Sequence, residues 1–443
     1  MCKCSRIKEL IMPISIERIK SKQITIGIVG LGYVGFPLSL VFAEANVRVI
    51  GFDIDVNKIS AIQEGKSYIH HINHGRLQKV RENDQFTATS NYEQISHCDA
   101  VIICVPTPLD HHLEPDLRFV EETCESIAPH LQPYTLVSLE STTWPGTTDE
   151  VVLPILEKSG KVRLNENLYL CFSPEREDPG NKSFGTKNIP KLVGGANEKS
   201  LELAVELYRL GIENIVPLSS MRVAETAKLF ENIFRSVNIA LVNELKLICD
   251  PMGIDVWEVI RAAATKPFGF MPFWPGPGLG GHCIPIDPFY LTWKAKEFGV
   301  QTRFIELAGE INRSMPRYVV SKVQDCLNHS EKAMKGSKIL ILGLAYKSDI
   351  DDMRESPSLE LIKMMQEKGA VVDYHDNHIP EIGMSREYSF LEGKKSVSLS
   401  ENYDCFVLAT KHSYFSADHI LSFRVPTVDT RNFLPENSLV FKA

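Results

Sequence analysis

The chain has 443 residues, enough for two or three domains, and its 44% hydrophobic and 23% charged content is ordinary for a soluble globular protein. A formal net charge of −8 argues against nucleic acid as a main partner, and it predicts that an anionic ligand meets local basic residues. No apolar run is long enough to span a membrane, so we expect no membrane partner.

The ten cysteines lack the spacing of a metal site. Cys104, Cys171 and Cys405 lie in apolar runs, where they are most simply interpreted as buried thiols. Residues 1–22 carry no apolar core of a signal peptide, and we interpret them as an N-terminal extension. These features predict a reducing, cytoplasmic location, with no disulfide framework and no metal.

A glycine-rich loop follows the first predicted strand, residues 24–29, and a helical pattern follows the loop. The loop has the sequence GLGYVG at residues 30–35. Gly30 permits a tight turn, Gly32 lets the backbone approach a pyrophosphate, and Gly35 lets helix and strand pack closely. The N–H groups at the helix start would bind the pyrophosphate, so the sequence predicts a dinucleotide site.

The acid that such a site needs stands at the end of the next apolar run. Residues 47–52 lead into Asp53, about twenty residues after the loop. A carboxylate there accepts hydrogen bonds from the adenosine ribose and repels a 2′-phosphate, which predicts NAD rather than NADP. Lys58 follows on the next helix, and we expect it in solvent or near the pyrophosphate.

Alternating strand and helix patterns predict a doubly wound parallel sheet in this part of the chain, with ligand loops at the carboxyl ends of the strands. Three such loops carry hydroxyl or carboxyl groups, at Thr107, Thr142 and Glu175. Taken alone, each loop could be an ordinary turn without a binding role, because Pro, Gly, Ser and Thr are common in turns. The strands are predicted at 24–29, 47–52, 100–105, 135–139 and 168–172.

A long helix is predicted from about Ser220 to Cys249. Lys228 and Asn232 are four residues apart and share a face of it. Lys228 could be an ordinary solvated lysine, but the pattern of the surrounding residues is otherwise typical of a buried helix. The apolar residues recur at spacings of three and four: Val223, Ala227, Phe230, Phe234, Val237 and Leu241.

The last part of the chain shows a second α/β pattern that opens with a buried strand at residues 338–344. Ser356 is predicted to cap a helix that has Pro357 at its first position. Because this part lacks GxGxxG, it should bind something other than a dinucleotide. Further strands are predicted at 371–374, 404–409 and 426–429.

Cys283 lies in the sequence PGPGLGGHCIPIDP at residues 275–288. A thiolate beside a nicotinamide site can capture the aldehyde that the first hydride transfer produces, so that a second hydride leaves from the same carbon. The loop and the cysteine together therefore predict oxidation of an alcohol to an acid.

From about Ile24 to its end, the sequence resembles the UDP-sugar 6-dehydrogenases, and most of all the branch that acts on UDP-N-acetylhexosamines. The motifs in question are GLGYVGFPL (30–38), ESTTWPGTT (140–148), SPERE-DPG (173–180), ETAKLFEN (225–232), PGPGLGGHCIPIDP (275–288), GLAYKSDIDDMRESPSLEL (343–361) and VDTRN (428–432). The resemblance implies an α/β fold of two Rossmann-like doubly wound parallel-sheet domains joined by a central long-helix segment.

The expected organisation has four parts. Residues 1–22 form the extension, 23–215 the NAD-binding domain, 216–325 a helical dimerisation segment with the catalytic cysteine, and 326–443 a UDP-binding domain. The resemblance thus implies NAD as cofactor, a UDP-sugar as substrate and a homodimer or larger homo-oligomer.

The resemblance also implies roles for single residues. Cys283 would be the nucleophile, forming a thiohemiacetal and then a thioester. Lys228 would stabilise the charge that develops on oxygen, Asn232 would hold that oxygen or its water, and Asp287 would assist water or proton transfer. Thr142 and Glu175 would orient a catalytic water and the thioester.

The remaining expected contacts fall into two groups. The cofactor is expected to meet Gly30, Gly32, Tyr33, Val34, Gly35, Asp53, Lys58, Thr107 and Thr142. The substrate is expected to meet Glu175, Arg176, Lys228, Asn232, Gly280, Lys347 and Arg431, of which Lys347 and Arg431 would contact the UDP half.

The sequence departs from the UDP-glucose branch at His282 and Ile286, where that branch has Ser and Lys. Together with Arg176 directly after Glu175, this favours a 2-acetamido sugar, first of all UDP-N-acetylglucosamine, oxidised to the uronic acid with two NADH for surface polysaccharide synthesis. UDP-N-acetylmannosamine, UDP-N-acetylgalactosamine and UDP-glucose are the alternatives. His282 is not expected to be the base for Cys283, because adjacent residues in an extended loop point apart.

Two other classes of protein share part of this pattern. A single-step β-hydroxyacid dehydrogenase would need no nucleophilic cysteine and would produce one NADH. A non-enzymatic NAD-binding protein would have lost catalytic positions, whereas Cys283, Lys228, Asn232 and Asp287 are all present.

Overall fold

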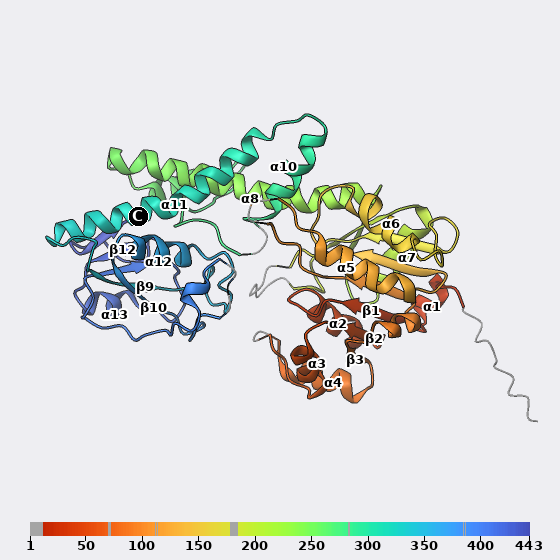
Figure 1. Cartoon of the computed structure of the whole chain (residues 1–443). Coiled ribbons are helices and arrows are strands. Elements are labelled where there is room, and N and C mark those ends of the chain that lie inside the picture. Colours follow the sequence, from red (N-terminus) through yellow and green to blue (C-terminus); the bar gives the residue numbers. More distant parts are fainter. Residues whose placement is uncertain are drawn as a thin grey trace, which may run out of the picture. The chain divides into compact units, whose positions relative to one another are not determined.

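The computed structural model describes residues 12–69, 72–110, 112, 114–177, 185–281, 284–383, 385 and 387–443. The chain divides into two compact units, Met1–Leu229 and Phe230–Ala443, which Figure 1 colours from red to green and from green to blue. Each unit is built around a sheet with helices on both faces, so the predicted fold class is confirmed.

The sheet of the first unit has the strand order β3-β2-β1-β4-β5-β6-β7-β8. All neighbouring strands are parallel except β6 and β7, which are antiparallel. Five strands were predicted, whereas β3, β7 and β8 were missed because they are short and poorly patterned. The strands are β1 (Thr25–Val29), β2 (Arg48–Phe52), β3 (Phe86–Thr89), β4 (Ala100–Ile103), β5 (Thr135–Leu139), β6 (Leu168–Phe172), β7 (Lys191–Gly195) and β8 (Ile215–Leu218).

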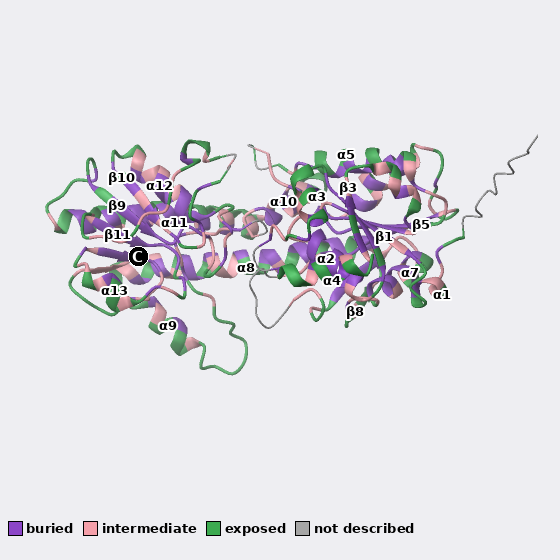
Figure 2. Ribbon diagram, turned by 90° about the horizontal axis from the view of Figure 1, so that it is seen from below, coloured by how far each residue is buried: buried purple, intermediate pink, exposed green. Residues whose placement is uncertain are grey.

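Helices α2 and α7 cover one face of this sheet and α5 covers the other, as Figure 2 shows. Because both faces are covered, the central strands are buried over most of their length, which is why they read as continuous apolar runs. The helices are α1 (Ile16–Lys20), α2 (Gly35–Glu44), α3 (Val56–Gln63), α4 (His74–Glu82), α5 (Arg118–Ile127), α6 (Leu153–Glu157) and α7 (Glu198–Tyr208), with short turns η1 (Tyr92–His97), η2 (Ala128–His130) and η3 (Thr148–Val152).

The sheet of the second unit is parallel throughout, in the order β10-β9-β11-β12-β13. Its strands are β9 (Lys338–Leu342), β10 (Val371–His375), β11 (Cys405–Leu408), β12 (Thr427–Asp429) and β13 (Val440–Lys442), and only the last was not predicted. Helices α11 and α12 bury one face of β9 through Ile339 and Ile341, and α13 covers the other through Leu340 and Leu342.

The helices of this unit are α9 (Val256–Ala263), α10 (Asp287–Glu297), α11 (Arg303–His329), α12 (Pro357–Glu367) and α13 (Ala417–Ser422), with short turns η4 (Asp250–Met252) and η5 (Ser389–Leu391). The predicted cap of α12 is confirmed, because the Ser356 side chain accepts a hydrogen bond from the Ser358 N–H and Pro357 takes the first helical position. The cap fixes where α12 begins, at the carboxyl end of β9.

The predicted long helix is α8 (Met221–Cys249). The sequence favours burial of its apolar stripe, but Phe230, Phe234 and Leu241 are 64%, 41% and 60% exposed. The buried side of the helix mixes apolar residues such as Leu229 with polar ones, which include Lys228 and Asn232. The helix therefore buries a different side from the predicted stripe, and this side carries polar groups.

The described cysteines agree with the expectation of buried thiols. Cys104, Cys171 and Cys405 are free and buried, as are the other cysteines of the described residues. No helix within the described ranges combines the length and the apolar character needed to cross a bilayer.

Candidate functional site

The glycine loop after β1 has the geometry of a phosphate-binding turn. Gly30 has φ 92°, and a Cβ atom on it would lie 2.6 Å from the Cys104 carbonyl oxygen. A Cβ atom on Gly35 would lie 1.9 Å from the Gly30 carbonyl oxygen, so helix and strand could not approach as they do. At Gly32 the same position has no described atom within 4 Å, which leaves room for a ligand beside the backbone.

The start of α2 is open to the same ligand. Val34 is its N-cap residue, and no described side chain caps the helix there. Tyr33 and Val34 are half-buried, and Thr107 is buried in the loop that follows β4. Because β1 and β4 are neighbours where the strand order reverses, their loops meet at the point where doubly wound sheets bind ligands.

Asp53 follows the end of β2 and is fixed beside the glycine loop. Its Oδ2 accepts a hydrogen bond from the Leu31 N–H at 2.8 Å, and its Oδ1 accepts one from the Asp55 N–H at 2.9 Å. Lys58 was expected in solvent or near the pyrophosphate, but its Nζ pairs with Asp53 Oδ2 at 3.1 Å. A cation therefore stands beside the carboxylate that was expected to discriminate against NADP.

A buried network of charged side chains lies at the carboxyl ends of β5 and β6. Lys191 Nζ donates to Glu140 Oε2 at 2.7 Å and to Glu175 Oε2 at 3.1 Å. Tyr208 Oη donates to Glu140 Oε1 at 2.6 Å and lies 2.8 Å from Ser138 Oγ. Glu175 was predicted from the sequence, whereas the partners that hold it were not.

The direction of β7 explains how Lys191 reaches this edge. Because β7 is antiparallel to β6, its first residue lies beyond the carboxyl end of β6. Phe172 pairs with Gly194 in this register, and continuing the same register brings Lys191 opposite Glu175. The available signal was a lysine at the start of a short apolar run, but the direction of a strand cannot be read from its own residues.

The three charges shift one another's pKa values. Burial raises the pKa of Glu140, and only part of that effect is offset by Lys191. Burial would also raise the pKa of Glu175, but Lys191 and the N–H groups of Arg176 and Glu177 bring it below its usual value. Burial would lower the pKa of Lys191, but the two carboxylates raise it above its usual value. Glu175 is therefore the carboxylate that stays ionised.

The first turns of α8 are tied to the loop that follows β5. Glu225 is fully buried and accepts hydrogen bonds from the Gly146 N–H at 2.6 Å and from the Thr148 N–H and hydroxyl at 3.0 and 2.7 Å. Lys228 follows one turn later and is 8% exposed, without a described ion-pair partner. A buried cation of this kind is available to an anionic group of a substrate.

Two threonines of the same loop differ in their surroundings. Thr142, which was predicted, is half-buried. Thr143 is 1% exposed, and its Oγ1 has no hydrogen-bond partner among the described residues. Thr143 was not predicted as a site residue, although its unpaired hydroxyl is one that a bound ligand or water would satisfy.

In the second unit, Asn232 and Asp287 form a buried pair. Asn232 lies on α8 and donates from Nδ2 to Asp287 Oδ2 at 2.5 Å, at the first position of α10. Both side chains are buried, at 7% and 2% exposure. Cys283 and His282 lie outside the described residues, four and five positions before Asp287 in the sequence.

The glycine-rich segment before Cys283 is held by two buried asparagines. Asn243 on α8 accepts a hydrogen bond from the Gly276 N–H at 3.0 Å and donates to Asn312 on α11 at 2.9 Å. A Cβ atom on Gly280 would lie 2.5 Å from the Tyr346 Cβ atom, so this segment packs directly on the loop after β9. Gly280 is therefore placed by packing against the chain itself.

Arg431 lies beside the same segment, after β12. Its Nε donates to the Ala409 carbonyl oxygen at 2.6 Å, and a Cβ atom on Gly276 would lie 2.7 Å from its Nη1. Burial lowers the pKa of the Arg431 guanidinium to about 10, although Asp429 acts in the opposite direction. Lys347 is half-buried in the loop after β9. An anion bound at these strand ends would stabilise the charge of Arg431.

One cluster in the second unit has residue types that bind metals. Asp349, His378 and His412 bring one ligand atom each within 4.8 Å of one another. However, His412 Nε2 lies 3.0 Å from Asp376 Oδ2, and its Nδ1 accepts a hydrogen bond from the Asp349 N–H at 3.0 Å. Because both ring nitrogens of His412 are engaged, this arrangement serves to hold the loops together.

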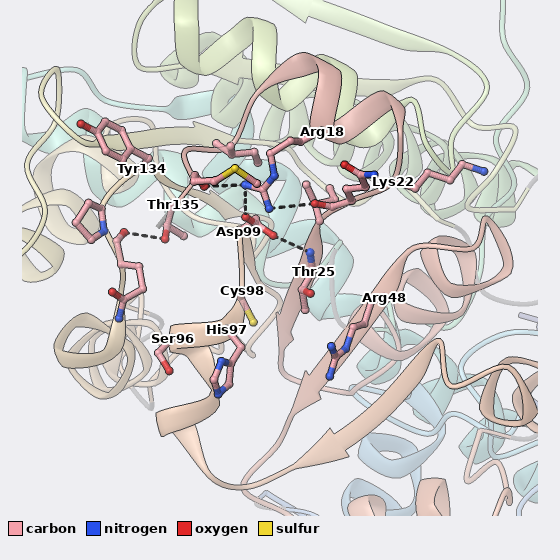
Figure 3. Close-up of a pocket in the computed structure, with 16 residues that line it drawn as sticks. Arg18, Lys22, Thr25, Arg48, Ser96, His97, Cys98, Asp99, Tyr134 and Thr135 are labelled. Atoms are coloured by element: carbon pink, nitrogen blue, oxygen red, sulfur yellow. Dashed lines mark hydrogen bonds and ion pairs between the residues drawn. The ribbon is translucent and has the colours of Figure 1, made fainter. Parts of the chain in front are cut away.

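A pocket of about 830 Å³ lies at the opposite edge of the first sheet, at the amino ends of the strands (Figure 3). Arg18 pairs there with Asp99 at 2.8 Å, and Asp99 accepts a hydrogen bond from the Thr25 N–H at 2.9 Å. These contacts fasten α1 to the sheet. Because cofactors of such sheets bind at the carboxyl ends of the strands, this pocket is not the dinucleotide site.

The chain matches three models of the UDP-glucose/GDP-mannose dehydrogenase family. Residues 24–211 match its NAD binding domain, 222–314 its central domain and 340–436 its UDP binding domain. The glycine loop and Asp53 lie within the first match, so NAD is the cofactor of the first unit.

Proteins of known function are similar over most of their length. The UDP-N-acetyl-D-glucosamine 6-dehydrogenase of Pseudomonas aeruginosa is 36% identical over 396 residues, 89% of this chain and 92% of that protein. The UDP-N-acetyl-D-mannosamine dehydrogenase of Yersinia pestis is 33% identical over 407 residues, 89% and 94%. The structure of the UDP-D-ManNAc dehydrogenase of Pyrococcus horikoshii aligns with a TM-score of 0.84 at 31% identity, over 95% of this chain and 99% of that one.

Proposed function

Because the chain belongs to the UDP-glucose/GDP-mannose dehydrogenase family, we propose that it oxidises the C6 hydroxyl of a UDP-N-acetylhexosamine to the carboxylate. The preferred substrate in this proposal is UDP-N-acetylglucosamine, with two NADH formed per sugar. The observation that carries it is the buried pair of Asn232 and Asp287, four residues after Cys283 in a chain of this family.

The chemistry assigns one task to each residue. Two NAD molecules, bound one after the other, would each accept one hydride. Cys283 attacks the aldehyde carbon to give a thiohemiacetal, which the second oxidation converts to a thioester. The Lys228 ammonium stabilises the charge that develops on the substrate oxygen, and Asn232 holds that oxygen or its water. Water then releases the acid.

The same proposal assigns residues to the diphosphate and to the release of the acid. Arg431 and Lys347 provide counter-charge for the UDP half, which an acidic chain must supply locally. Thr142 and Glu175 orient the hydrolytic water and the thioester, and Asp287 assists proton transfer. Arg176 and Gly280 border the sugar in this assignment.

The choice of sugar rests on the 2-acetamido branch, which His282, Ile286 and Arg176 favour. Relatives named for N-acetylglucosamine and for N-acetylmannosamine are about equally similar, at 36% and 33% identity. UDP-N-acetylmannosamine is therefore the second candidate, and the two differ in the orientation of one acetamido group.

A panel of UDP-sugars with NAD tests the proposal. We expect the highest kcat/KM with UDP-N-acetylglucosamine, two NADH per sugar by absorbance at saturation, and a product with one added negative charge. One NADH per sugar with free aldehyde would contradict the thioester route, and a preference for the manno epimer would correct the substrate alone.

Cys283→Ser is the matched variant for this test. A hydroxyl is a far weaker nucleophile and leaving group than a thiol, so turnover should fall by orders of magnitude while NAD binding is kept. Turnover near the wild-type rate would move the chemistry away from Cys283.

We also propose that two copies associate through α8, that the enzyme works in the cytoplasm, and that its product serves surface polysaccharide synthesis. The exposed apolar stripe of α8 supports the first point, since Phe234, Leu241 and Ile248 recur every seven residues and are 41%, 60% and 52% exposed. Such a stripe is a packing seam between helices.

A further inference from the structure

Lys191 is the cation of the buried network, and no step described so far uses it. Its side chain is 4% exposed, and it lies between Glu140, which is fully buried, and Glu175, which is 12% exposed. The network thus leads from the interior of the sheet to one carboxylate at the edge where the cofactor loops lie. Glu175 is the member that a water molecule can reach.

Both carboxylate oxygens of Glu175 accept hydrogen bonds from the protein. Oε1 accepts hydrogen bonds from the N–H groups of Arg176 and Glu177, both at 2.7 Å, and Oε2 accepts from Lys191. These donors favour the ionised form, and they fix the carboxylate plane. The backbone donors would be present in almost any variant, so Lys191 is the component of this support that a side-chain change can remove.

We propose that Lys191 is a positioning residue that keeps Glu175 ionised and oriented as the base for thioester hydrolysis. The inference rests on the proposed function. In the step it serves, the oxygen of a water molecule forms a bond to the thioester carbonyl carbon, and Glu175 takes a proton from that water. The carbon–sulfur bond then breaks, and its electron pair returns to Cys283 as the thiolate.

Glu140 influences how strongly Lys191 acts on Glu175. It accepts a hydrogen bond from the Lys191 ammonium and is itself held by Tyr208, so the ammonium lies between two fixed carboxylates. Lys191 Nζ lies 2.7 Å from Glu140 and 3.1 Å from Glu175, so both carboxylates share its charge. Burial still leaves the pKa of Glu140 raised, whereas Lys191 and the backbone N–H groups lower the pKa of Glu175. The expected consequence is a base that remains ionised well below neutral pH.

Lys191→Met removes the charge and keeps a chain of similar length. Burial should then dominate, and the acidic limb of the kcat profile should move up by about one to three pH units. At the acid end of a scan between about pH 5 and pH 9, kcat should fall on the order of 10-fold or more, and it should recover at the alkaline end. KM for NAD and for the sugar should change little.

A second readout follows the blocked step. If hydrolysis slows, a rapid burst of two NADH per active site should precede the slow phase. Intact-mass spectrometry of the acid-quenched enzyme should then show the acyl adduct in Lys191→Met and far less in wild type. Lys191→Arg retains a cation at this position. The acidic limb of its kcat profile should therefore lie close to that of the wild type.

Lys187→Met is the control, since Lys187 pairs with Glu44 at 2.7 Å on the surface of the same unit and is 51% exposed. It should behave as wild type. A loss in Lys191→Met that is equal at all pH values, or a wild-type profile, would overturn the positioning role. If wild-type enzyme itself fails to produce two NADH from any UDP-sugar, the proposed function fails instead.

Discussion

At the scale of single residues, we expect Asp53 and Lys58 together to influence the choice between NAD and NADP. Asp53 is held by the Leu31 and Asp55 N–H groups, and Lys58 lies 3.1 Å from it. The carboxylate can accept hydrogen bonds from the ribose hydroxyls, whereas the neighbouring ammonium weakens its repulsion of a 2′-phosphate. From the sequence, Lys58 was expected to complicate this preference only slightly, because its contact with Asp53 was not visible.

We expect Asp53→Ala to lower kcat/KM for NAD on the order of 10-fold, because hydrogen bonds to a charged group are lost. The same change should narrow the preference for NAD over NADP. Lys58→Ala, its matched partner, should widen that preference by leaving the carboxylate unopposed. The measurement is kcat/KM for both cofactors in all three proteins, and a constant ratio would show that Asp53 does not face the ribose.

Where a residue's role depends on its neighbours in the sequence, that role could be predicted from the sequence alone. The roles of Gly30, Gly32 and Gly35 follow from a loop of six positions, and the cap at Ser356 from two. The partners of Glu175 were not accessible, because Lys191 reaches it only through the antiparallel direction of β7.

At the scale of elements, α8 shows why an apolar period did not identify the buried side of a helix. Its buried side carries Lys228 together with Glu225, Asn232 and Asn243, and the last three bond to the loop after β5, to Asp287 and to Gly276. The partners that make burial of Glu225, Asn232 and Asn243 favourable come from distant parts of the chain. Periodicity correctly predicted the helix but could not predict its orientation.

The position of Lys228 on this helix leads to a kinetic prediction. Lys228→Ala removes a charge that is needed more in the transition state than in the ground state, so kcat should fall on the order of 10²-fold with little change in KM. Arg222→Ala is the control, because Arg222 pairs with Asp149 at 2.8 Å on the exposed side of the same helix. A change confined to KM in Lys228→Ala would make Lys228 a binding residue.

At the scale of the whole molecule, the two units repeat one plan with different ligands. In each, an acid after the second strand of the repeat accepts an N–H from the loop after the first, Asp53 from Leu31 and Asp376 from Leu344. The same carboxylate oxygen has a second partner in each unit, Lys58 beside Asp53 at 3.1 Å and the buried His412 beside Asp376 at 3.0 Å. The second unit matches the UDP binding domain of the family, in agreement with the prediction from the missing GxGxxG that it binds something other than a dinucleotide.

The exposed stripe of α8 gives the final prediction, which concerns assembly. A charge in the middle of an apolar seam is costly to bury, so Leu241→Glu should shift the protein from dimer to monomer in analytical ultracentrifugation. Phe390→Glu is the matched control, since Phe390 is 56% exposed and Leu241 is 60% exposed, but Phe390 lies outside α8. The control should remain dimeric. Dissociation of both variants, or of neither, would place the interface elsewhere, whereas dissociation of Leu241→Glu alone would assign it to the α8 stripe.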